Sequence, residues 1–545
     1  MACSIFARAS LAAICASSIA ALGCGDSGPE ETSGVTYQRD VRPLIERSCT
    51  SCHTADGPTP YDFTYSAEMF ESGTPSWAAA AVAAVDAGRM PPWMPADDCH
   101  ELAYERRLTE DERAVFRAWS DNKFAVGDEA DFVPLEDGPS APDLGEPTIE
   151  LTPEDDYVAS SEASDDYRCF ILPYDFDAET YVVGSTVVPG VLPIAHHALI
   201  YVIPPDLEQT IRGLDEDDEG IGYTCFGGPG GGVLSTLGGW VPGSVPTGAP
   251  ADSAAVVPAG SKLVLQMHYN TLALGAGTGA PPDRTTVKLW TRPEAPSFRI
   301  ESIPLAHLAM QIDAFDEASV QERLYRMPID AKLVGVTPHM HTLGTQISVS
   351  HEPAGADAQC VVDIPDWDFH WQQQYTIPES ASLELKKGDG VRVQCTYDNS
   401  QANQPLVDGM PRTPEDVTWG ENTLDEMCLA YLFLQVPFDT PDFRCGAYTD
   451  CMASCSDSDG PCLFECATTG GGQCASCLFP AIFSCAPAYC AADGLALQSC
   501  VSGCEKTAAR CIAVECGAEW DAFAGCMAPH VDNGDCSEQI AKCGL

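Results

Sequence analysis

The sequence has few basic residues. Lys and Arg together number 28 against 80 Asp and Glu, which gives the 545-residue chain a formal net charge of −52. A surface this acidic repels nucleic acid and anionic lipid, so the composition excludes polyanion binding. Beyond the N-terminus no run approaches eighteen uninterrupted apolar residues, and no membrane-spanning helix is expected. Apolar residues still make up 45% of the chain, which is enough for several packed domains and excludes wholesale disorder.

Cysteine, in contrast, is abundant, and 27 residues favour an oxidising compartment. Residues 1–24 have one basic residue, Arg8, and then a short apolar run that ends at Cys24. The segment resembles a bacterial lipoprotein signal peptide, which implies that Cys24 carries lipid; ordinary signal cleavage beside an incidental Cys is the alternative. Residues 25–36 predict a polar tether. We therefore expect an exported protein that meets the membrane only through a lipid anchor in the bacterial cell envelope, in the periplasm or at the outer membrane or cell surface.

The segment CTSCH over residues 49–53 has the C-x-x-C-H spacing of covalent haem attachment. In this interpretation Cys49 and Cys52 form thioethers with the haem and His53 binds the iron from one face. A disulfide between the two cysteines, beside an unrelated His, is the alternative.

The surrounding residues 37–128 resemble a small all-α cytochrome c. The resemblance implies that Met90, just before two prolines, is the sixth iron ligand, although Met94 is close enough to compete. A thioether ligand raises the haem potential and suits an electron relay. Residues 129–150, rich in acid, Pro and Gly, predict a linker to the next domain.

Short alternating apolar runs over residues 151–437 predict antiparallel β-sandwiches. Four segments of these strands carry unusual side chains: His196 and His197, His268, His339 and His341, and Met427. Singly, each His could be a polar residue on a solvated strand face. However, five of the 11 His in the chain fall in these segments, which favours metal binding.

The spacing of the histidines bears on how they could share a metal. His339 and His341 are two apart on a predicted strand, so their side chains leave the same face. His196 and His197 are adjacent, and they need a local distortion or a strand end to converge. His268 must come from another strand.

Imidazole ligands alone leave the metal open among Zn, Cu, Fe and Ni. A zinc hydrolase would use three His and a water molecule, with no role for Met427. A thioether beside two imidazoles is softer and favours Cu(I), so the set that includes Met427 indicates copper.

Residues 151–437 resemble the copper type II, ascorbate-dependent monooxygenases, the group of peptidylglycine alpha-hydroxylating and dopamine beta-monooxygenases. The segments that carry the resemblance, in the order of the family, are IAHHALIYVI, VLQMHYN, TPHMHTLGTQISV and TLDEMCLAYLF. The resemblance implies two jelly-roll-like sandwiches, over residues 151–297 and 298–437, with one copper ion in each.

The resemblance also assigns roles to the side chains. His196, His197 and His268 would hold an electron-transfer copper, and His339, His341 and Met427 the copper at which oxygen and substrate react. The implied reaction is hydroxylation of an aliphatic C–H bond. One atom of O2 enters the product and the other becomes water, so two electrons are needed, from ascorbate or another donor.

Two disulfides follow from the same resemblance. A bridge between Cys395 and Cys428 would fix the strand next to Met427, and a bridge between Cys169 and Cys225 would brace the first sandwich. Sequence alone does not establish connectivity.

The substrate is where this chain departs from the family. Peptide-hydroxylating members have an Arg two residues before the first His of the H-x-H pair, and this chain has Thr337. An Asn after the Met ligand is replaced by Leu429, although Tyr431 matches. Loss of a bidentate carboxylate clamp argues against peptide C-termini as substrates. His370, in the segment DWDFHWQQQY, is a weaker substrate-binding candidate, and an aromatic core or loop cluster is its alternative.

The simplest hypothesis is therefore a copper monooxygenase that acts on an unknown small molecule with O2 and receives electrons through its own haem domain. A non-catalytic copper-binding or electron-transfer lipoprotein on the same fold is the alternative. We expect a monomer, with a separate electron-donor protein as a further partner.

Residues 438–545 form a Cys-rich module with pairs such as Cys451/Cys455, Cys462/Cys466 and Cys500/Cys504. Cysteines four apart lie on one helix face, so the spacing predicts helices stapled by disulfides. His530 is the only His in this module, which argues against a zinc site. A partner-binding module and a protease-resistant cap remain as alternatives.

Overall fold

The computed structural model describes residues 34–50, 52–55, 61–135, 142–160, 165–205, 207–225, 228–230, 235–271, 279–307, 310–407, 410–420, 423–440, 489–502, 522–523 and 526–527. The predicted signal peptide, Cys24 and most of the tether lie outside these residues, as do His530 and the tail cysteines of the predicted i, i+4 pairs other than Cys500. None of the helices within the described ranges is long and apolar enough to cross a membrane.

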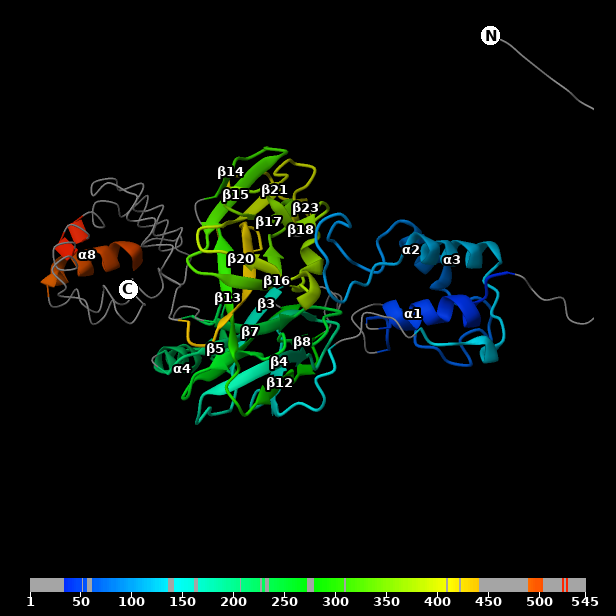
Figure 1. The fold of residues 1–545 in the computed structure, drawn as a ribbon, viewed down its shortest axis with the longest axis horizontal. Coiled ribbons are helices and arrows are strands. Elements are labelled where there is room, and N and C mark those ends of the chain that lie inside the picture. The colour runs from blue at the N-terminus through cyan, green and yellow to red at the C-terminus, as the bar shows by residue number, and fades with distance from the viewer. Residues whose placement is uncertain are drawn as a thin grey trace, which may run out of the picture.

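A small helical module opens the described chain (Figure 1). It contains η1 (Tyr37–Val41), α1 (Arg42–Ser48), α2 (Ala78–Asp86), α3 (Glu110–Asp121) and η2 (Glu129–Asp131). Thr109 and Glu112 form a reciprocal capping box that fixes the start of α3. Tyr37 and Trp119 are fully buried at the centre of the module, so it has a core of its own.

The first sandwich consists of two antiparallel layers. One layer has the order β1 (Ile149–Leu151), β12 (Thr286–Arg292), β4 (Thr180–Val188) and β9 (Ser253–Val257), with β8 (Thr247–Gly248) beside β4. The other has the order β6 (Tyr223–Thr224), β3 (Asp165–Ile171), β10 (Lys262–Asn270), β5 (Ala195–Ile203) and β7 (Ser235–Trp240). The short pair β2 (Tyr157–Val158) and β11 (Pro282–Asp283) and the helix α4 (Glu208–Asp217) complete it.

The second sandwich has the same two-layer form. One layer has the order β13 (Phe298–Ala306), β25 (Leu429–Pro437), β16 (Ala331–His339) and β19 (Tyr375–Thr376), with β20 (Leu383–Leu385) beside β16. The other has the order β15 (Ser319–Arg326), β21 (Gly390–Tyr397), β17 (Gly344–Glu352) and β18 (Gln359–Ile364). Shorter elements are β14 (Gln311–Ile312), β24 (Val417–Thr418), β22 (Leu406–Val407), β23 (Met410–Pro411), η4 (Phe369–Trp371) and η5 (Glu379–Ala381). The prediction of β-sandwiches is confirmed.

The two sandwiches share a sheet. β9 of the first pairs in parallel with β13 of the second, through Ser253 opposite Phe298 and Ala254 opposite Arg299. One layer of each sandwich therefore belongs to a single ten-stranded sheet. The shared sheet holds the two sandwiches in a fixed relation.

The segment between α2 and α3 is attached to the second sandwich. Cys99 forms a disulfide with Cys360 of β18. The amide of Ala96 donates to the carbonyl of Asp363 at 2.7 Å, and that of Ala103 to the carbonyl of Thr376 at 2.8 Å. These contacts place the helical module beside the sandwiches (Figure 1).

Beyond the sandwiches, the described part of the Cys-rich tail includes α8 (Ala491–Ser502). Cys490, at its start, forms a disulfide with Cys526. This bridge is not one of the predicted pairs of cysteines four residues apart, so that pairing stays a prediction.

Candidate metal centres

His196, His197 and His268 converge because strand β5 contains a bulge. His197 lies opposite His268 across the antiparallel pair of β5 and β10, whereas the next residue of β10, Tyr269, pairs with Ala195. His196 is therefore the extra residue of a β-bulge, a feature that redirects side chains. This is the local distortion that two adjacent histidines need in order to face one point.

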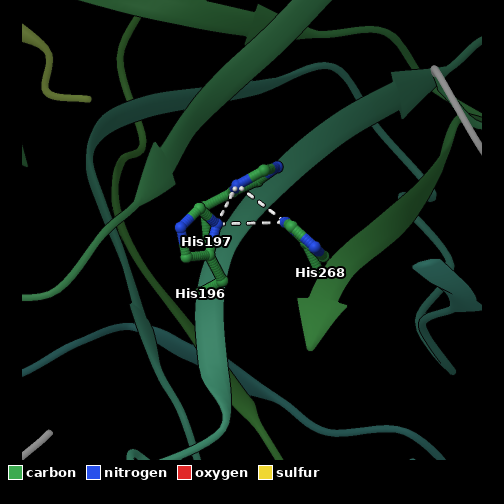
Figure 2. Close-up of side chains that lie close together, drawn as sticks. All are labelled: His196, His197 and His268. Carbon is green, nitrogen blue, oxygen red and sulfur yellow. Dashed lines mark hydrogen bonds between the residues drawn. The ribbon is translucent and has the colours of Figure 1, made fainter. Parts of the chain in front are cut away.

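The three imidazoles form a compact group (Figure 2). Their Nδ1 atoms are separated by 3.0 Å (His196 to His268), 3.2 Å (His196 to His197) and 3.3 Å (His268 to His197). Nitrogens at these separations can all lie about 2 Å from a single ion, the usual length of a metal–imidazole bond. Burial, reinforced by the neighbouring imidazoles, lowers the pKa of His197 well below its usual value, so its ring is neutral and able to bind a metal. The donor set fits copper.

The tautomer of His268 is fixed from outside the group. Its Nε2–H donates to Oδ1 of Asp165 at 2.9 Å, so its Nδ1 carries the lone pair that faces the other two rings. Tyr167 stacks on the same imidazole, with ring centroids 4.0 Å apart. Asp165 and Tyr167 both belong to β3, the strand that pairs with β10 on its other side.

His339 and His341 lie at the end of β16, and their ring centroids are 5.1 Å apart. Nδ1–H of His339 donates to Oε1 of Gln372, and Nδ1–H of His341 donates to the carbonyl of Asp425 at 3.0 Å. Because both Nδ1 atoms are occupied, Nε2 is the atom that each ring can offer to a metal. Burial lowers the pKa of His339 to about 3, which keeps that ring neutral.

One detail of this group differs from the prediction. β16 ends at His339, so His341 lies just past the strand rather than within it. The carboxylate of Glu426 accepts hydrogen bonds from the backbone N–H groups of His341, at 2.8 Å, and Leu343, at 2.6 Å. These bonds replace the strand pairing, and they orient the turn.

Met427 reaches the same place from β25. Leu429, the first residue of that strand, pairs with His339, and Met427 stands two residues before it and lines the same cavity as His339 and His341. The hydroxyl of Tyr397 donates to the carbonyl of Met427 at 2.7 Å. Cys428, the next residue, is bonded to Cys395, and Cys169 is bonded to Cys225 in the first sandwich, so the structure contains both disulfides that the resemblance implies.

A single cavity of about 430 Å³ connects the two groups of side chains. His197, His339, His341 and Met427 all line it. Phe369 lines it too, and its ring centroid lies 5.6 Å from that of His196 and 6.1 Å from that of His341. The first group therefore reaches this space through His197, and the second through His339, His341 and Met427.

The residues considered for substrate choice also lie in this cavity. Thr337, Leu429 and Tyr431 line it. Of the segment that contains His370, Gln372, Gln373 and Gln374 line it, whereas the side chain of His370 lies outside what the structure describes.

Sequence reasoning missed several residues of the site: Asp165, Gln372, Glu426, Arg106 and the Cys99–Cys360 bridge. A single Asp at the start of a strand, such as Asp165 in β3, is too common to predict a contact with a histidine. Glu426 stands next to Met427 in the sequence, so a buried carboxylate beside a ligand could have been suspected.

The C-x-x-C-H segment follows α1 directly. Nδ1–H of His53 donates to the carbonyl of Tyr61 at 3.1 Å, which leaves Nε2 as the metal-binding atom, and the ring stacks on Phe63 with centroids 4.1 Å apart. Cys49 does not form a disulfide, and burial raises the pKa of its thiol to about 12. The motif lies against the first sandwich, because a Cβ atom at Gly243 would come within 2.9 Å of Sγ of Cys52. These residues fit a covalently attached haem.

The two candidate methionines separate in space. Met90 packs against the core of the helical module. Met94 packs against the core of the second sandwich, where its sulfur accepts a hydrogen bond from the amide of Asp368 at 3.3 Å. Of the two, Met90 therefore shares a core with Cys49 of the C-x-x-C-H segment.

Solved structures that resemble this chain do so weakly. The major capsid protein P2 of bacteriophage PM2 has a TM-score of 0.24 and 12% identity, and the match covers 53% of this chain and 98% of that one. A putative secreted protein from Eubacterium rectale has a TM-score of 0.16 and 11% identity, covering 51% of this chain and 70% of that one. Scores this low carry no functional argument.

A family model matches most of the second sandwich, from after β14, and extends past its last strand. Residues 316–451 match the C-terminal domain of the copper type II ascorbate-dependent monooxygenases. The match includes His339, His341, Met427 and both cysteines of the Cys395–Cys428 bridge. The second sandwich is thus similar to the C-terminal domain of a copper monooxygenase, which supports copper as the metal and a monooxygenase-like function.

Proposed function

We propose that this protein is a copper-dependent monooxygenase that hydroxylates an aliphatic C–H bond of a small molecule. The observation that carries the proposal is the single cavity that His197 of the first group lines together with His339, His341 and Met427 of the second, in a chain whose residues 316–451 match the C-terminal domain of the copper monooxygenase family. A simple copper carrier has no need of two different ligand sets at one cavity.

In this proposal His196, His197 and His268 hold one copper ion and His339, His341 and Met427 hold the other. Bound copper would supply one-electron chemistry and the activation of O2. Each of three imidazoles, those of His268, His339 and His341, donates its other ring N–H to Asp165, Gln372 or the carbonyl of Asp425. These bonds keep the metal-facing nitrogen unprotonated and fix the orientation of each ring. The apolar walls of the cavity limit water, which protects reactive species from side reactions.

The helical module is proposed to carry haem and to deliver electrons. Cys49 and Cys52 would form the thioethers, His53 and Met90 would bind the iron, and the haem would supplement or replace ascorbate as the donor. Support comes from the position of Cys52 against Gly243 of the first sandwich and from the residues of the module that line the cavity, which include Trp93 and Tyr104.

The first test is metal and haem stoichiometry on mature protein made in a haem-attaching periplasm. We expect about two copper ions and about one covalent haem per chain, with about one copper lost in Met427→Ala and in His339→Ala. Copper-dependent O2 consumption with ascorbate should require both copper sites. Zinc, or a folded protein that takes up no copper when copper is supplied, contradicts the proposal.

The electron route is tested separately with His53→Ala. In a stopped-flow experiment, reduced haem of the unaltered protein should be reoxidised when Cu(II) is present, and Met90→Ala should change the haem spectrum while Met94→Ala leaves it unchanged. If turnover with a protein electron donor is the same in His53→Ala, the haem has no part in electron delivery.

A further inference from the structure

The cavity has an unusual charge balance for this molecule. The chain as a whole has a formal net charge of −52, yet no Asp or Glu is among the described residues that line the cavity. Two guanidinium groups line it instead, those of Arg47 and Arg106. Both belong to the helical module, so this module contributes positive charge to a space that the two sandwiches otherwise enclose.

The two arginines differ in what balances their charge. Nη1 of Arg47 forms an ion pair with Oε1 of Glu112 at 2.7 Å. Arg106 is only 9% exposed, and its Nη1 donates to the carbonyl of Gly243 at 2.8 Å. Within the described ranges Arg106 forms no ion pair with a carboxylate. Its buried charge therefore has a backbone carbonyl as its hydrogen-bond partner, and its acidic neighbours are the thiol of Cys52 and the phenol of Tyr375, which are neutral near pH 7.

A buried charge without a counter-charge is costly, and buried guanidinium groups are normally paired. A role restricted to joining the module to Gly243 would not need a charge, because a neutral amide could donate the same bond. Burial also lowers the pKa of Arg106, the direction expected when no anion is present to stabilise the charged form. The missing partner is thus an anion that enters from outside the described chain.

We propose that Arg106 binds the carboxylate of a ligand in this cavity. A guanidinium is the side chain best suited to a carboxylate, because two parallel N–H groups can meet two oxygens. The remaining walls are largely apolar and aromatic, with Trp93, Trp240 and Phe369 among them, and a volume of about 430 Å³ suits a small organic molecule. The ligand class is a small monocarboxylate with an apolar body.

This assignment also accounts for Thr337. The peptide-hydroxylating members of the family have an Arg at that position, which here lies on β16 two residues before His339, and this chain does not. Here the cation comes instead from the helical module, which is fixed to β19 by the bond from Ala103 to Thr376. A ligand whose carboxylate binds Arg106 would present a different part of its body to His339, His341 and Met427 than a ligand bound at position 337.

The carboxylate has two conceivable sources, a diffusible acid or a propionate of the attached haem. If it is a diffusible acid, its identity as the substrate rests on the proposed function. The two sources predict different measurements on the same protein.

The test uses the full-length protein loaded with haem and copper, and the probes are phenylacetate and its neutral analogue phenylacetamide. Isothermal titration should show that the acid binds about 10- to 100-fold more tightly than the amide, the range expected for a hydrogen-bonded charge. Arg106→Gln should abolish that ratio while keeping a donor for Gly243, and Arg106→Lys should retain part of it. Arg107→Gln is the matched control, because Arg107 pairs with Glu105 and does not line the cavity.

The haem potential of the same variants separates the sources. If a haem propionate is the partner, Arg106→Gln will shift the haem potential. The unaltered protein will then bind phenylacetate and phenylacetamide equally well. In that case Arg106 does bind a carboxylate, and the carboxylate belongs to the haem. If Arg106→Gln changes neither the ratio nor the potential and remains folded with full copper content, Arg106 is only a structural link and the inference is wrong. Copper content is measured in every sample. Absence of copper from the unaltered protein would overturn the proposed function, whereas the acid-to-amide ratio and the haem potential decide separately whether Arg106 binds a carboxylate.

Discussion

Asp165 explains how a strand residue outside the imidazole group can control metal binding. Its carboxylate accepts the Nε2–H of His268, so it sets both the tautomer and the orientation of a proposed ligand. The sequence predicted the three histidines but not this partner, because the contact joins residues 103 positions apart and depends on the register of β3 and β10.

Asp165→Asn should weaken copper binding at the group of His196, His197 and His268 by about 10- to 100-fold, since an amide cannot accept the imidazole proton with the same strength. Competition with a chromophoric Cu(I) chelator measures this. Asp177→Asn, on an exposed carboxylate of the same sandwich, should leave the affinity unchanged. Equal affinities in all three proteins would show that Asp165 does not support the metal site.

Asp389 is a second buried carboxylate, remote from the cavity, and it links stability to pH. Burial alone would raise the pKa of Asp389, but hydrogen bonds from the amides of Lys386 and Ala354 and from the imidazole of His351 outweigh burial and lower it. A lowered carboxyl pKa in the folded state contributes stability above the usual Asp value of about 3.9, and this contribution is lost as the pH falls through the folded-state pKa.

Asp389→Asn should therefore lower the free energy of unfolding by roughly 1 to 3 kcal/mol at pH 7, with a smaller difference near pH 3. Urea unfolding at pH 7, 5 and 3 measures both effects. Asp357→Asn, at an exposed position in the β17–β18 turn, is the control. A difference between Asp389→Asn and the unaltered protein that stays constant down to pH 3 would contradict this account.

The elements show which features local sequence can specify. Alternation of apolar residues predicted the strands, because each sheet has one buried face and the side-chain period of a strand is two. The H-x-H spacing placed His339 and His341 together correctly even though β16 ends at the first of them. The sequence indicated that His196 and His197 need a local distortion in order to converge. It could not locate the bulge, because the position of the bulge depends on the pairing of β5 with β10.

The turn after β16 depends on a single side chain from a neighbouring element. Glu426 stands just before β25 and accepts the N–H groups of His341 and Leu343, so it connects the segment that carries Met427 to the segment that carries His341. Glu426→Ala would leave two buried donors without partners, at a cost of roughly 1 to 3 kcal/mol for each.

We expect Glu426→Ala to lose the copper ion of the second sandwich and to keep that of the first. Elemental analysis together with urea unfolding would establish both effects. Glu415→Ala removes an exposed carboxylate that pairs with Arg412, and it should retain both ions. Full copper retention in Glu426→Ala would show that the turn is held by other contacts.

Across the whole molecule, contacts between distant segments determine the site. The shared ten-stranded sheet, the attachment of residues 96–106 to the second sandwich and the position of Arg106 in the cavity all join segments that are far apart in the sequence. No local pattern encodes them. For this reason the sequence indicated the metal ligands and the fold class, yet it did not indicate that the helical module completes the cavity.

The Cys99–Cys360 bridge should hold this arrangement together. It closes a separation of 261 residues, and in the chain-entropy model a loop of that length stabilises the folded state by roughly 5 to 6 kcal/mol. Replacing both cysteines by Ser should increase hydrogen exchange at the amides of Ala96 and Ala103, which donate to the second sandwich, by roughly tenfold or more.

Mass spectrometry of exchanged peptides measures that change. A double Ser replacement at Cys490 and Cys526 removes a bridge of the tail and should leave both amides as protected as before. Unchanged protection without the Cys99–Cys360 bridge would mean that hydrogen bonds and packing alone attach the module.

The same bridge sets an order for maturation of the chain. Cys49, Cys52 and Cys99 are synthesised well before Cys360, as are Cys169 and Cys225, which pair with each other, so an oxidant that meets the emerging chain finds Cys99 beside thiols that are not its native partner. Thiol–disulfide exchange favours whichever thiols are accessible at that moment. Covalent capture of Cys49 and Cys52 by haem would remove both competitors and reserve Cys99 for the partner that arrives last, so cofactor attachment would act as a safeguard against misfolding.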